Sequence, residues 1–293
     1  MKHYMPETMT ELIRSLWELT PDSRIISGGT DLINAMNQGL CHPDALLYLG
    51  NIKGIRDISL TPDGIHIGAM VTMSDLAECS LLTGPYAALR HAGADVGSPQ
   101  IREAATIGGN IANASPAGDL SPVLFLLQAQ VVIADGSSSS QGESATRLLP
   151  IHKVLTGSGK TSLTCHEAII GFVLPSEWPV SAKSAFYKLG YRRAVTISRI
   201  GLAILFDFDP DGRITLAEVI AGAIAPTPVH VEKAEQFLIG KQPDTKAAKE
   251  VGRFLSELIL DITPEEFDRD YKVKAAFGIA EDVFHKIAAG AGT

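Results

Sequence analysis

The chain has 293 residues and 45% of them are hydrophobic, which is enough for more than one core, so we expect two or three domains. Its formal net charge of -8, without any concentration of Lys and Arg, argues against nucleic acid as a partner. No secretory signal pattern opens the sequence and the longest apolar stretch, Val123 to Ala134, is too short to span a bilayer, so we expect a cytoplasmic protein with no membrane span.

The residues that commonly bind metals are few and dispersed. Cys41, Cys79 and Cys165 are too scattered for a disulfide framework or a four-thiolate cluster, and we expect reduced thiols. None of the eight histidines stands at ligand spacing from another. The sequence therefore predicts no metal site on this chain.

The first 57 residues read as a helix followed by a strand, a loop and a second helix. Thr8 to Glu11 has capping-box form and opens a run with helical spacing. The short apolar run Ile25–Ile26 leads through a Gly-Gly loop into a helix, and Ala45 to Leu49 reads as the next strand. We place the end of this first subdomain at residue 57.

A second subdomain, residues 58–175, is predicted from new strand and turn signals. Strands are expected at Ile65 to Gly68, Val131 to Ile133 and Ala168 to Leu174, and short helices from Ser74, from Pro85 and over Leu120 to Leu127. The segment 96–122 is rich in small residues, which indicates that another group, not identified by the sequence, approaches its backbone closely. Asp135 to Ser144 reads as a mobile polar loop.

A third domain, residues 176–293, reads as an antiparallel sheet with helices on one face. Its expected strands cover 186–189, 201–208 and 214–221, with a hairpin turn at Asp209 to Gly212. Three helical stretches are predicted at 229–238, 245–260 and 267–288, and the last is opened by the capping-box sequence Thr263 to Glu266.

Two glycine-rich loops are the main candidates for a binding site. The first, Ser27-Gly28-Gly29-Thr30-Asp31, joins a strand to a helix, and the second is Thr106-Ile107-Gly108-Gly109-Asn110. Such loops let ligand oxygens approach backbone N–H groups without a Cβ in the way, which suits a diphosphate. Each loop taken alone is also compatible with an ordinary tight turn. The hypothesis that both loops bind one ligand is more specific than a binding role for either loop alone.

Other nucleotide-binding patterns are incomplete. The Gly-x-Gly-x-x-Gly fingerprint is absent around both loops, which disfavours a nicotinamide-type Rossmann domain. The segment Gly157 to Thr161 resembles the end of a P-loop, but Val154 stands where that motif needs its first glycine. An NTPase is therefore disfavoured.

Two charged residues stand in apolar surroundings. Asp119 precedes a predicted helix and has two candidate roles, capping that helix or contacting a ligand. Lys188 lies in a strand-like segment and either points to solvent or lies beside an electron-accepting ring. The sequence leaves both alternatives open.

These motifs, in this order and spacing, resemble the FAD-binding medium subunit of the molybdenum hydroxylases, a family that includes xanthine and carbon monoxide dehydrogenases. The likeness covers nearly the whole chain. It rests on Ile26 to Leu32, Ile67 to Ala69, Gln100 to Ile111, Ala114 to Pro116 with Asp119, and Gly157 to Thr161.

The resemblance implies an α+β fold. Two α/β subdomains would sandwich FAD, in the FAD-binding fold of the PCMH/vanillyl-alcohol-oxidase type, ahead of a C-terminal antiparallel sheet with a helical bundle. It also implies FAD-binding roles for Ile25, Ile26, Ser27, Gly28, Gly29, Thr30, Asp31, Leu32, Gly97, Thr106, Gly108, Gly109, Asn110, Asn113, Asp119, Ile169 and Lys188. Within that set the two loops would hold the diphosphate and ribose, Asp119 the adenosine or ribityl side, and Ile169 and Lys188 would lie near the isoalloxazine.

Ser27 replaces the family's commoner alanine, a change expected to keep the loop and add a hydrogen bond.

The implied function is electron relay without acid–base catalysis. A large molybdopterin subunit would oxidise the substrate, and a small subunit with two two-iron centres would pass electrons to the flavin. NAD or another acceptor would then reoxidise this chain, within a dimer of heterotrimers. The alternatives are a flavoprotein oxidase that works alone and a scaffold without flavin, which the intact glycines of both loops disfavour.

Overall fold

A computed structural model describes residues 1–137, 145–192, 195–263 and 267–289. The chain divides into two compact units, each assembled from separate segments. Unit 1 consists of Met1–Asp75, Pro99–Ala114 and Gln128–Ser176, and unit 2 of Leu76–Ser98, Ser115–Leu127 and Glu177–Thr293. The predicted division at residues 57 and 175 stays a prediction.

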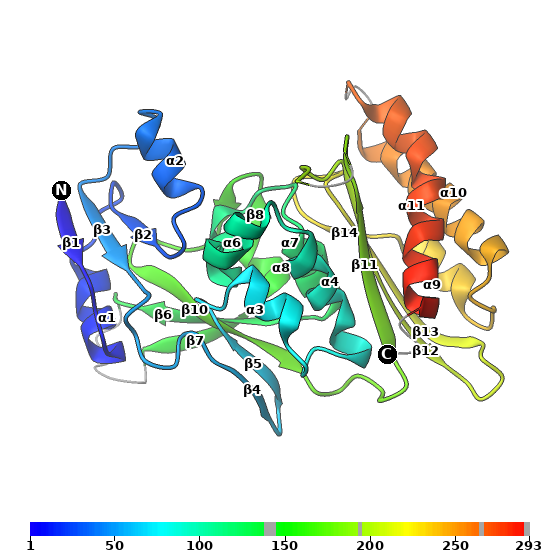
Figure 1. Ribbon diagram of the computed structural model, residues 1–293, viewed down its shortest axis with the longest axis horizontal. Helices are drawn as coiled ribbons and strands as arrows, with labels where there is room; N and C mark the ends of the chain where they lie inside the picture. The colour runs from blue at the N-terminus through cyan, green and yellow to red at the C-terminus, as the bar shows by residue number, and fades with distance from the viewer. Residues whose placement is uncertain (138–144, 193–194, 264–266, 290–293) are drawn as a thin grey trace. The chain divides into compact units, whose positions relative to one another are not determined.

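Unit 1 contains a small parallel sheet in which β3 lies between β1 and β2 (Figure 1). The strands are β1 (Lys2–Tyr4), β2 (Arg24–Ile26) and β3 (Ala45–Tyr48), with the helices α1 (Met9–Trp17) and α2 (Leu32–Asn37). Thr8 caps α1 as predicted, because its side chain accepts a hydrogen bond from the Glu11 amide at 3.2 Å. In a capping box the Glu11 carboxylate would accept a hydrogen bond from the amide of Thr8. Here it accepts from the amide of the preceding residue, Glu7, at 2.7 Å.

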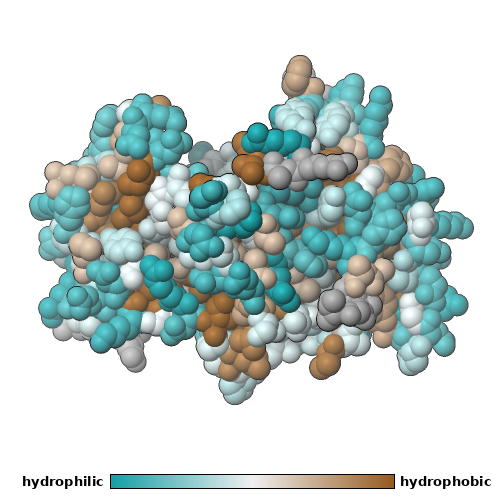
Figure 2. Space-filling model, in the orientation of Figure 1, coloured by the Kyte–Doolittle hydropathy of each residue, from teal (hydrophilic) through white to brown (hydrophobic). Residues whose placement is uncertain are grey.

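The larger sheet of unit 1 is antiparallel, with the order β4-β5-β10-β6-β7. Its strands are β4 (Ile58–Thr61), β5 (Gly64–Gly68), β6 (Gln130–Asp135), β7 (Thr146–Pro150) and β10 (Glu167–Pro175). The predicted polar loop extends to residue 144, and its residues 138–144 lie outside the described residues. Figure 2 shows hydrophobic surface over the β4–β5 hairpin, where Leu60 is exposed.

Short elements of unit 1 connect or follow these sheets. They are α5 (Pro99–Ala104), α6 (Ile107–Asn113), α8 (Ile151–Val154), β8 (Leu155–Gly157) and β9 (Lys160–Thr161), while α3 (Met73–Glu78) spans the boundary with unit 2.

Unit 2 is built on an antiparallel sheet with the order β11-β12-β13-β14. Its elements are β11 (Lys183–Leu189), β12 (Ile200–Phe208), β13 (Ile214–Gly222), β14 (Val229–His230), η1 (Gly84–Tyr86), α4 (Ala87–Asp95), α7 (Leu120–Leu126), α9 (Glu232–Leu238), α10 (Thr245–Ile262) and α11 (Arg269–Ala289). The helix predicted from Val229 begins three residues later, because Val229 and His230 pair with β13 instead. Of the predicted cap before the last helix, residues 264–266 lie outside the described residues.

Helices cover both faces of this sheet: the three C-terminal helices pack on one face as predicted, and α4 and α7 cover the other, which was not predicted. Ala185 lies in a hydrophobic core with α9, α10 and α11. The neighbouring Ser184 accepts a hydrogen bond from the Ala88 amide of α4 at 2.9 Å, and the ring of Pro122 in α7 packs on Gly222. Because successive side chains of a strand alternate, these contacts lie on opposite faces (Figure 1).

His91 of α4 is a partly buried imidazole whose Nδ1 is enclosed without a hydrogen-bond partner among the described residues. Burial lowers the pKa of His91 to about 4, with a further contribution from the charges of Lys286 and Arg90. The folded pKa lies below the unfolded value of 6.5, so the unfolded chain takes up a proton first as the pH falls. The neutral imidazole thus contributes stability above pH 6.5 that is lost towards pH 4.

We therefore expect acidification from pH 6.5 to pH 4 to destabilise unit 2 through His91. After allowance for the partial exposure of the ring, the contribution is about 2 kcal/mol. Urea unfolding at a series of pH values would measure it in the wild type and in His91→Leu, which cannot titrate. Equal slopes of unfolding free energy against pH in the two proteins would contradict this assignment.

Candidate functional site

The two glycine-rich loops, 27–31 and 106–110, are in direct contact inside unit 1. The Thr106 hydroxyl donates a hydrogen bond to Ser27 Oγ at 3.0 Å and accepts one from the Gly109 amide at 3.1 Å. A Cβ on Gly109 would lie 2.7 Å from Ser27 Oγ. The two loops therefore lie together and Ser27 takes part in a hydrogen bond, while their convergence on one ligand stays a prediction.

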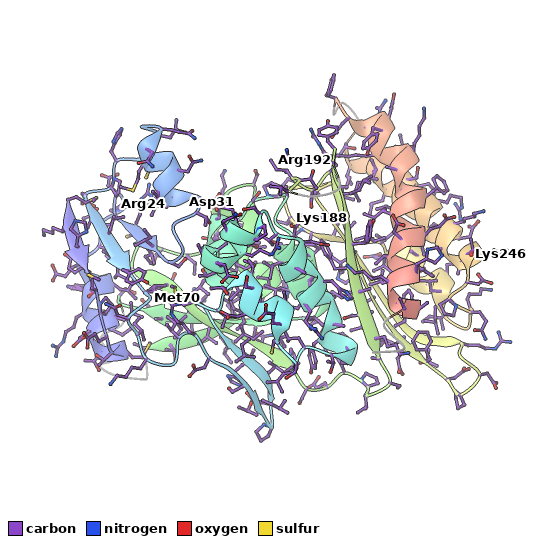
Figure 3. The ribbon with its side chains drawn as sticks, in the orientation of Figure 1. Arg24, Asp31, Met70, Lys188, Arg192 and Lys246 are labelled. Carbon is purple, nitrogen blue, oxygen red and sulfur yellow. The ribbon has the colours of Figure 1, made fainter. Side chains whose placement is uncertain are left out.

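The first loop has donors to offer a ligand. None of the hydrogen bonds found among the described residues is donated by the backbone amides of Gly28, Gly29, Thr30 or Asp31. These residues are half-buried or exposed, and Asp31 stands at the start of α2 without capping it through its side chain (Figure 3). Consecutive unpaired amides of this kind suit the oxygens of an anionic group.

The second loop works differently from the prediction, because its amides are already used by the protein. Ile107 and Gly108 donate to the carbonyls of Val71 and Ala69, at 3.0 and 2.9 Å. Its glycines instead allow close packing: a Cβ on Gly108 would lie 2.7 Å from that of Ala69. The second loop therefore contributes close packing of the backbone, and the polar group that it offers to a ligand is the Asn110 side chain.

Asn110 carries an unexplained polar atom. Its Oδ1 is buried and has no hydrogen-bond partner among the described residues. A buried amide oxygen without a partner costs about 1–3 kcal/mol, so such atoms call for a partner that is absent from the chain itself. A ligand hydroxyl or N–H at this loop would satisfy it.

The glycines of the first loop leave no room for side chains. A Cβ on Gly28 would lie 1.8 Å from the Ala104 carbonyl oxygen, which precedes the second loop. Gly29 has φ of +70°, a conformation that other residues adopt at a cost. Both glycines are thus required by the contact between the loops and by the turn.

The P-loop-like segment is a hairpin. Gly157 ends β8, Lys160 begins β9, and the Gly159 amide donates to the Ala114 carbonyl at 2.9 Å. A phosphate-binding P-loop needs a helix after its glycines. The NTPase interpretation therefore has no structural support.

Asp119 and Lys188 form a buried ion pair inside unit 2, with Lys188 extending from β11 (Figure 3). Lys188 Nζ lies 2.5 Å from Asp119 Oδ2 and 3.2 Å from the Thr196 carbonyl. The Ser198 hydroxyl donates to Asp119 Oδ1 at 2.5 Å. Burial raises the pKa of Asp119, while the Lys188 ammonium and these hydrogen bonds oppose that rise.

This geometry removes one alternative for each residue, and contact with a ligand stays a prediction. Both side chains are less than a tenth exposed, so Lys188 does not point to solvent. Asp119 precedes α7 but makes no side-chain capping hydrogen bond. Neither residue's partner was predicted, although a lone buried charge requires one.

The remaining predicted residues are spread over both units. Ile25, Ile26 and Leu32 flank the first loop and are half-buried. Ile169 is buried in β10, where the pairing with β6 is shifted. Asn113 ends α6 and is exposed, and Gly97 of unit 2 has φ of +48°.

Comparison with known proteins agrees with this fold. Residues 1–177 match the FAD binding domain in molybdopterin dehydrogenase, and residues 185–287 match the CO dehydrogenase flavoprotein C-terminal domain. The nicotinate dehydrogenase FAD-subunit of Eubacterium barkeri is 29% identical over 286 residues, which are 96% of this chain and 94% of the relative. The xanthine dehydrogenase FAD-binding subunit of Escherichia coli O157:H7 is 30% identical over 235 residues, 80% of this chain and 77% of the relative. The solved quinoline 2-oxidoreductase of Pseudomonas putida 86 has a chain of the same fold, with a TM-score of 0.86, 24% identity, and coverage of 100% of this chain and 98% of that one.

These matches define the flavoprotein component of an oxidoreductase. The chain belongs to the family of FAD-binding domains of molybdopterin dehydrogenases, and FAD is its cofactor. The residues fit that cofactor on structural grounds: unpaired amides in the first loop, a glycine cradle that a Cβ would fill, and the Asn110 oxygen without a partner. No helix within the described ranges is both long and apolar enough to cross a membrane.

Proposed function

We propose that this chain carries the flavin that relays electrons out of a multi-subunit molybdenum hydroxylase. The electrons would come from iron–sulfur centres on a partner subunit and leave to NAD or another acceptor. FAD suits this position because it accepts electrons singly and releases them in pairs. The chain's own residues would bind and orient the flavin rather than move protons.

The observation that carries the proposal is the contact between the two glycine-rich loops. Four unpaired amides of one loop lie against a glycine cradle and an unsatisfied amide oxygen of the other. Neither loop contains a lysine or arginine, so the diphosphate would be held by backbone donors. The ribose hydroxyls are the natural partners for Asn110 Oδ1.

Residue roles follow in part from this geometry. We assign the diphosphate and ribose to the first loop with Ile25, Ile26 and Leu32, and to Thr106, Gly108, Gly109, Asn110 and Asn113 of the second. Ile169 remains proposed beside the isoalloxazine. For Gly97, Asp119 and Lys188 of unit 2, contact with FAD stays a prediction from the family resemblance.

Partner chains are proposed on the same basis. The relatives are named as FAD subunits of nicotinate and xanthine dehydrogenase, names that imply other chains. We propose a molybdopterin-binding large subunit and a small subunit with two-iron centres, in a cytoplasmic heterotrimer. A flavoprotein oxidase that works alone is not favoured.

The flavin is tested first, by the absorption spectrum of the purified chain. We expect flavin bands that correspond to one FAD per chain, either as purified or after incubation with FAD. A chain that shows no flavin bands after incubation would contradict the proposed site.

The relay is tested separately, by copurification from the native host. A tagged chain should bring down a molybdenum subunit and an iron–sulfur subunit, and NADH should bleach the flavin absorption if NAD is the acceptor. A flavin-loaded chain that brings down neither subunit would contradict the relay while leaving FAD binding intact.

A further inference from the structure

Three potential metal ligands meet in unit 2, none of them among the residues predicted to contact FAD. Glu218 lies on β13, His230 on β14 and Glu235 on α9. His230 Nδ1 is 2.9 Å from Glu235 Oε1 and 3.7 Å from Glu218 Oε2. One ligand atom from each residue lies within 4.8 Å of the other two.

We propose that Glu218, His230 and Glu235 form a binding site for a divalent transition-metal ion, with Zn²⁺ as the reference ion. Nitrogen and carboxylate ligands bind Zn²⁺ at about 2.1 Å in tetrahedral geometry, which places ligand atoms about 3.4 Å apart. The two measured separations, 2.9 and 3.7 Å, lie on either side of that distance. Shifts of about half an ångström would bring these two pairs to the tetrahedral separation, and the ligand atoms of Glu218 and Glu235 lie within 4.8 Å of each other.

The charge of the cluster supports a cation. Two carboxylates face one imidazole, so with both carboxylates ionised the cluster stays negative even when His230 is protonated. No lysine or arginine forms an ion pair with Glu218 or Glu235 in the described ranges. Both carboxylates are about four-fifths buried, with side-chain exposures of 22% and 18%. An uncompensated carboxylate in such a position is costly, and a divalent ion would remove the cost.

A histidine–glutamate ion pair without metal explains only part of this arrangement. A protonated His230 would form ion pairs with both carboxylates, but its single charge balances only one of them. Glu235 Oε1 also accepts the Val219 amide at 2.9 Å, which fixes this carboxylate on the strand that carries Glu218. The exposed side of His230 would leave the fourth coordination position to water. Such an ion would tie β13, β14 and α9 together.

Zinc titration of the FAD-loaded full chain, after EDTA treatment and dialysis, would test the site by calorimetry. We expect the wild type to bind one Zn²⁺ at this site, and His230→Gln and Glu218→Gln to lose at least about 100-fold in affinity, since even outer-shell changes cost 10–100-fold. His285→Gln, a change at an exposed histidine of α11, is the matched control and should bind like the wild type.

Absence of saturable zinc binding in the wild type would overturn the proposal. So would equal binding by the wild type and both variants, which would assign the ion to other side chains such as the thiols. Far-UV circular dichroism and flavin absorption report folding and FAD content of each variant, so that a failed zinc site is distinguished from a failed flavin site. Glu218→Gln keeps the bond between His230 and Glu235. If His230→Gln does not fold, the zinc site is tested with Glu218→Gln alone.

Discussion

Gly28→Ala should lose FAD binding more completely than any other single methyl addition in the two loops. The new Cβ would lie 1.8 Å from the Ala104 carbonyl oxygen, and a backbone atom cannot rotate away. The loops must separate, at a cost of about 3 kcal/mol, the upper end of the overpacking range. We expect the dissociation constant for FAD to rise by about 100-fold or more, measured by flavin fluorescence titration.

Two further glycine variants make this prediction specific. Gly109→Ala should have a smaller effect, because the nearest atom is the Ser27 hydroxyl, a side-chain group that can turn aside. Gly54→Ala is the control in the same unit: Gly54 also has positive φ, +78°, but the only atom near its Cβ belongs to the Asp57 carboxylate, at 3.6 Å. Equal FAD affinity in Gly28→Ala and Gly54→Ala would show that the loop contact does not form the flavin site.

Asp119→Asn should destabilise unit 2 by about 3–5 kcal/mol, the usual cost of breaking a buried ion pair from one side. The Lys188 ammonium would then have no countercharge in an enclosed site, with only neutral oxygens such as the Thr196 carbonyl as acceptors. Lys188→Met should also destabilise the unit. The double variant should recover part of the loss, because no buried charge then remains without its partner.

The chain allows this loss to be assigned to one unit. It has two tryptophans, Trp17 in unit 1 and Trp178 in unit 2. In a Trp17→Phe background the fluorescence change in urea reports unit 2 through Trp178. Additive losses in the double variant would show that the two side chains do not depend on each other, contrary to the ion pair. FAD content measured in parallel shows whether Lys188 also serves the flavin.

The sequence predicted those parts of the fold that depend on local pattern. Alternating or continuous apolar runs located β3, β5, β10, β12 and β13, and the glycine loops were identified because few residues tolerate such turns. β1 was missed because three residues at the chain start, two of them exposed, carry little periodic signal. Its pairing with β3 is set by the tertiary fold.

The site was predicted where its residues form a recognisable motif and missed where single residues from separate segments form a pair. That the two glycine-rich loops lie together was anticipated from their shared composition and family spacing, whereas the bond between Ser27 and Thr106 was not. The partner of Lys188 stands 69 residues away, and no local pattern links it to Asp119. One neglected signal was available in Gly201 to Phe206, an unbroken apolar run that indicates a strand buried on both faces.

The second covered face of the β11–β14 sheet has a practical consequence for dissecting this protein. The helices α4 and α7 that cover it are encoded within residues 76–127, and the chain passes between the units after Asp75, Ser98, Ala114, Leu127 and Ser176. A gene fragment that starts near residue 177 would therefore encode a sheet stripped of these helices, with Phe186, Ala203 and Ile220 newly exposed to water. Such a fragment would be prone to aggregate, so subcloning at the apparent junction yields neither half of this protein intact.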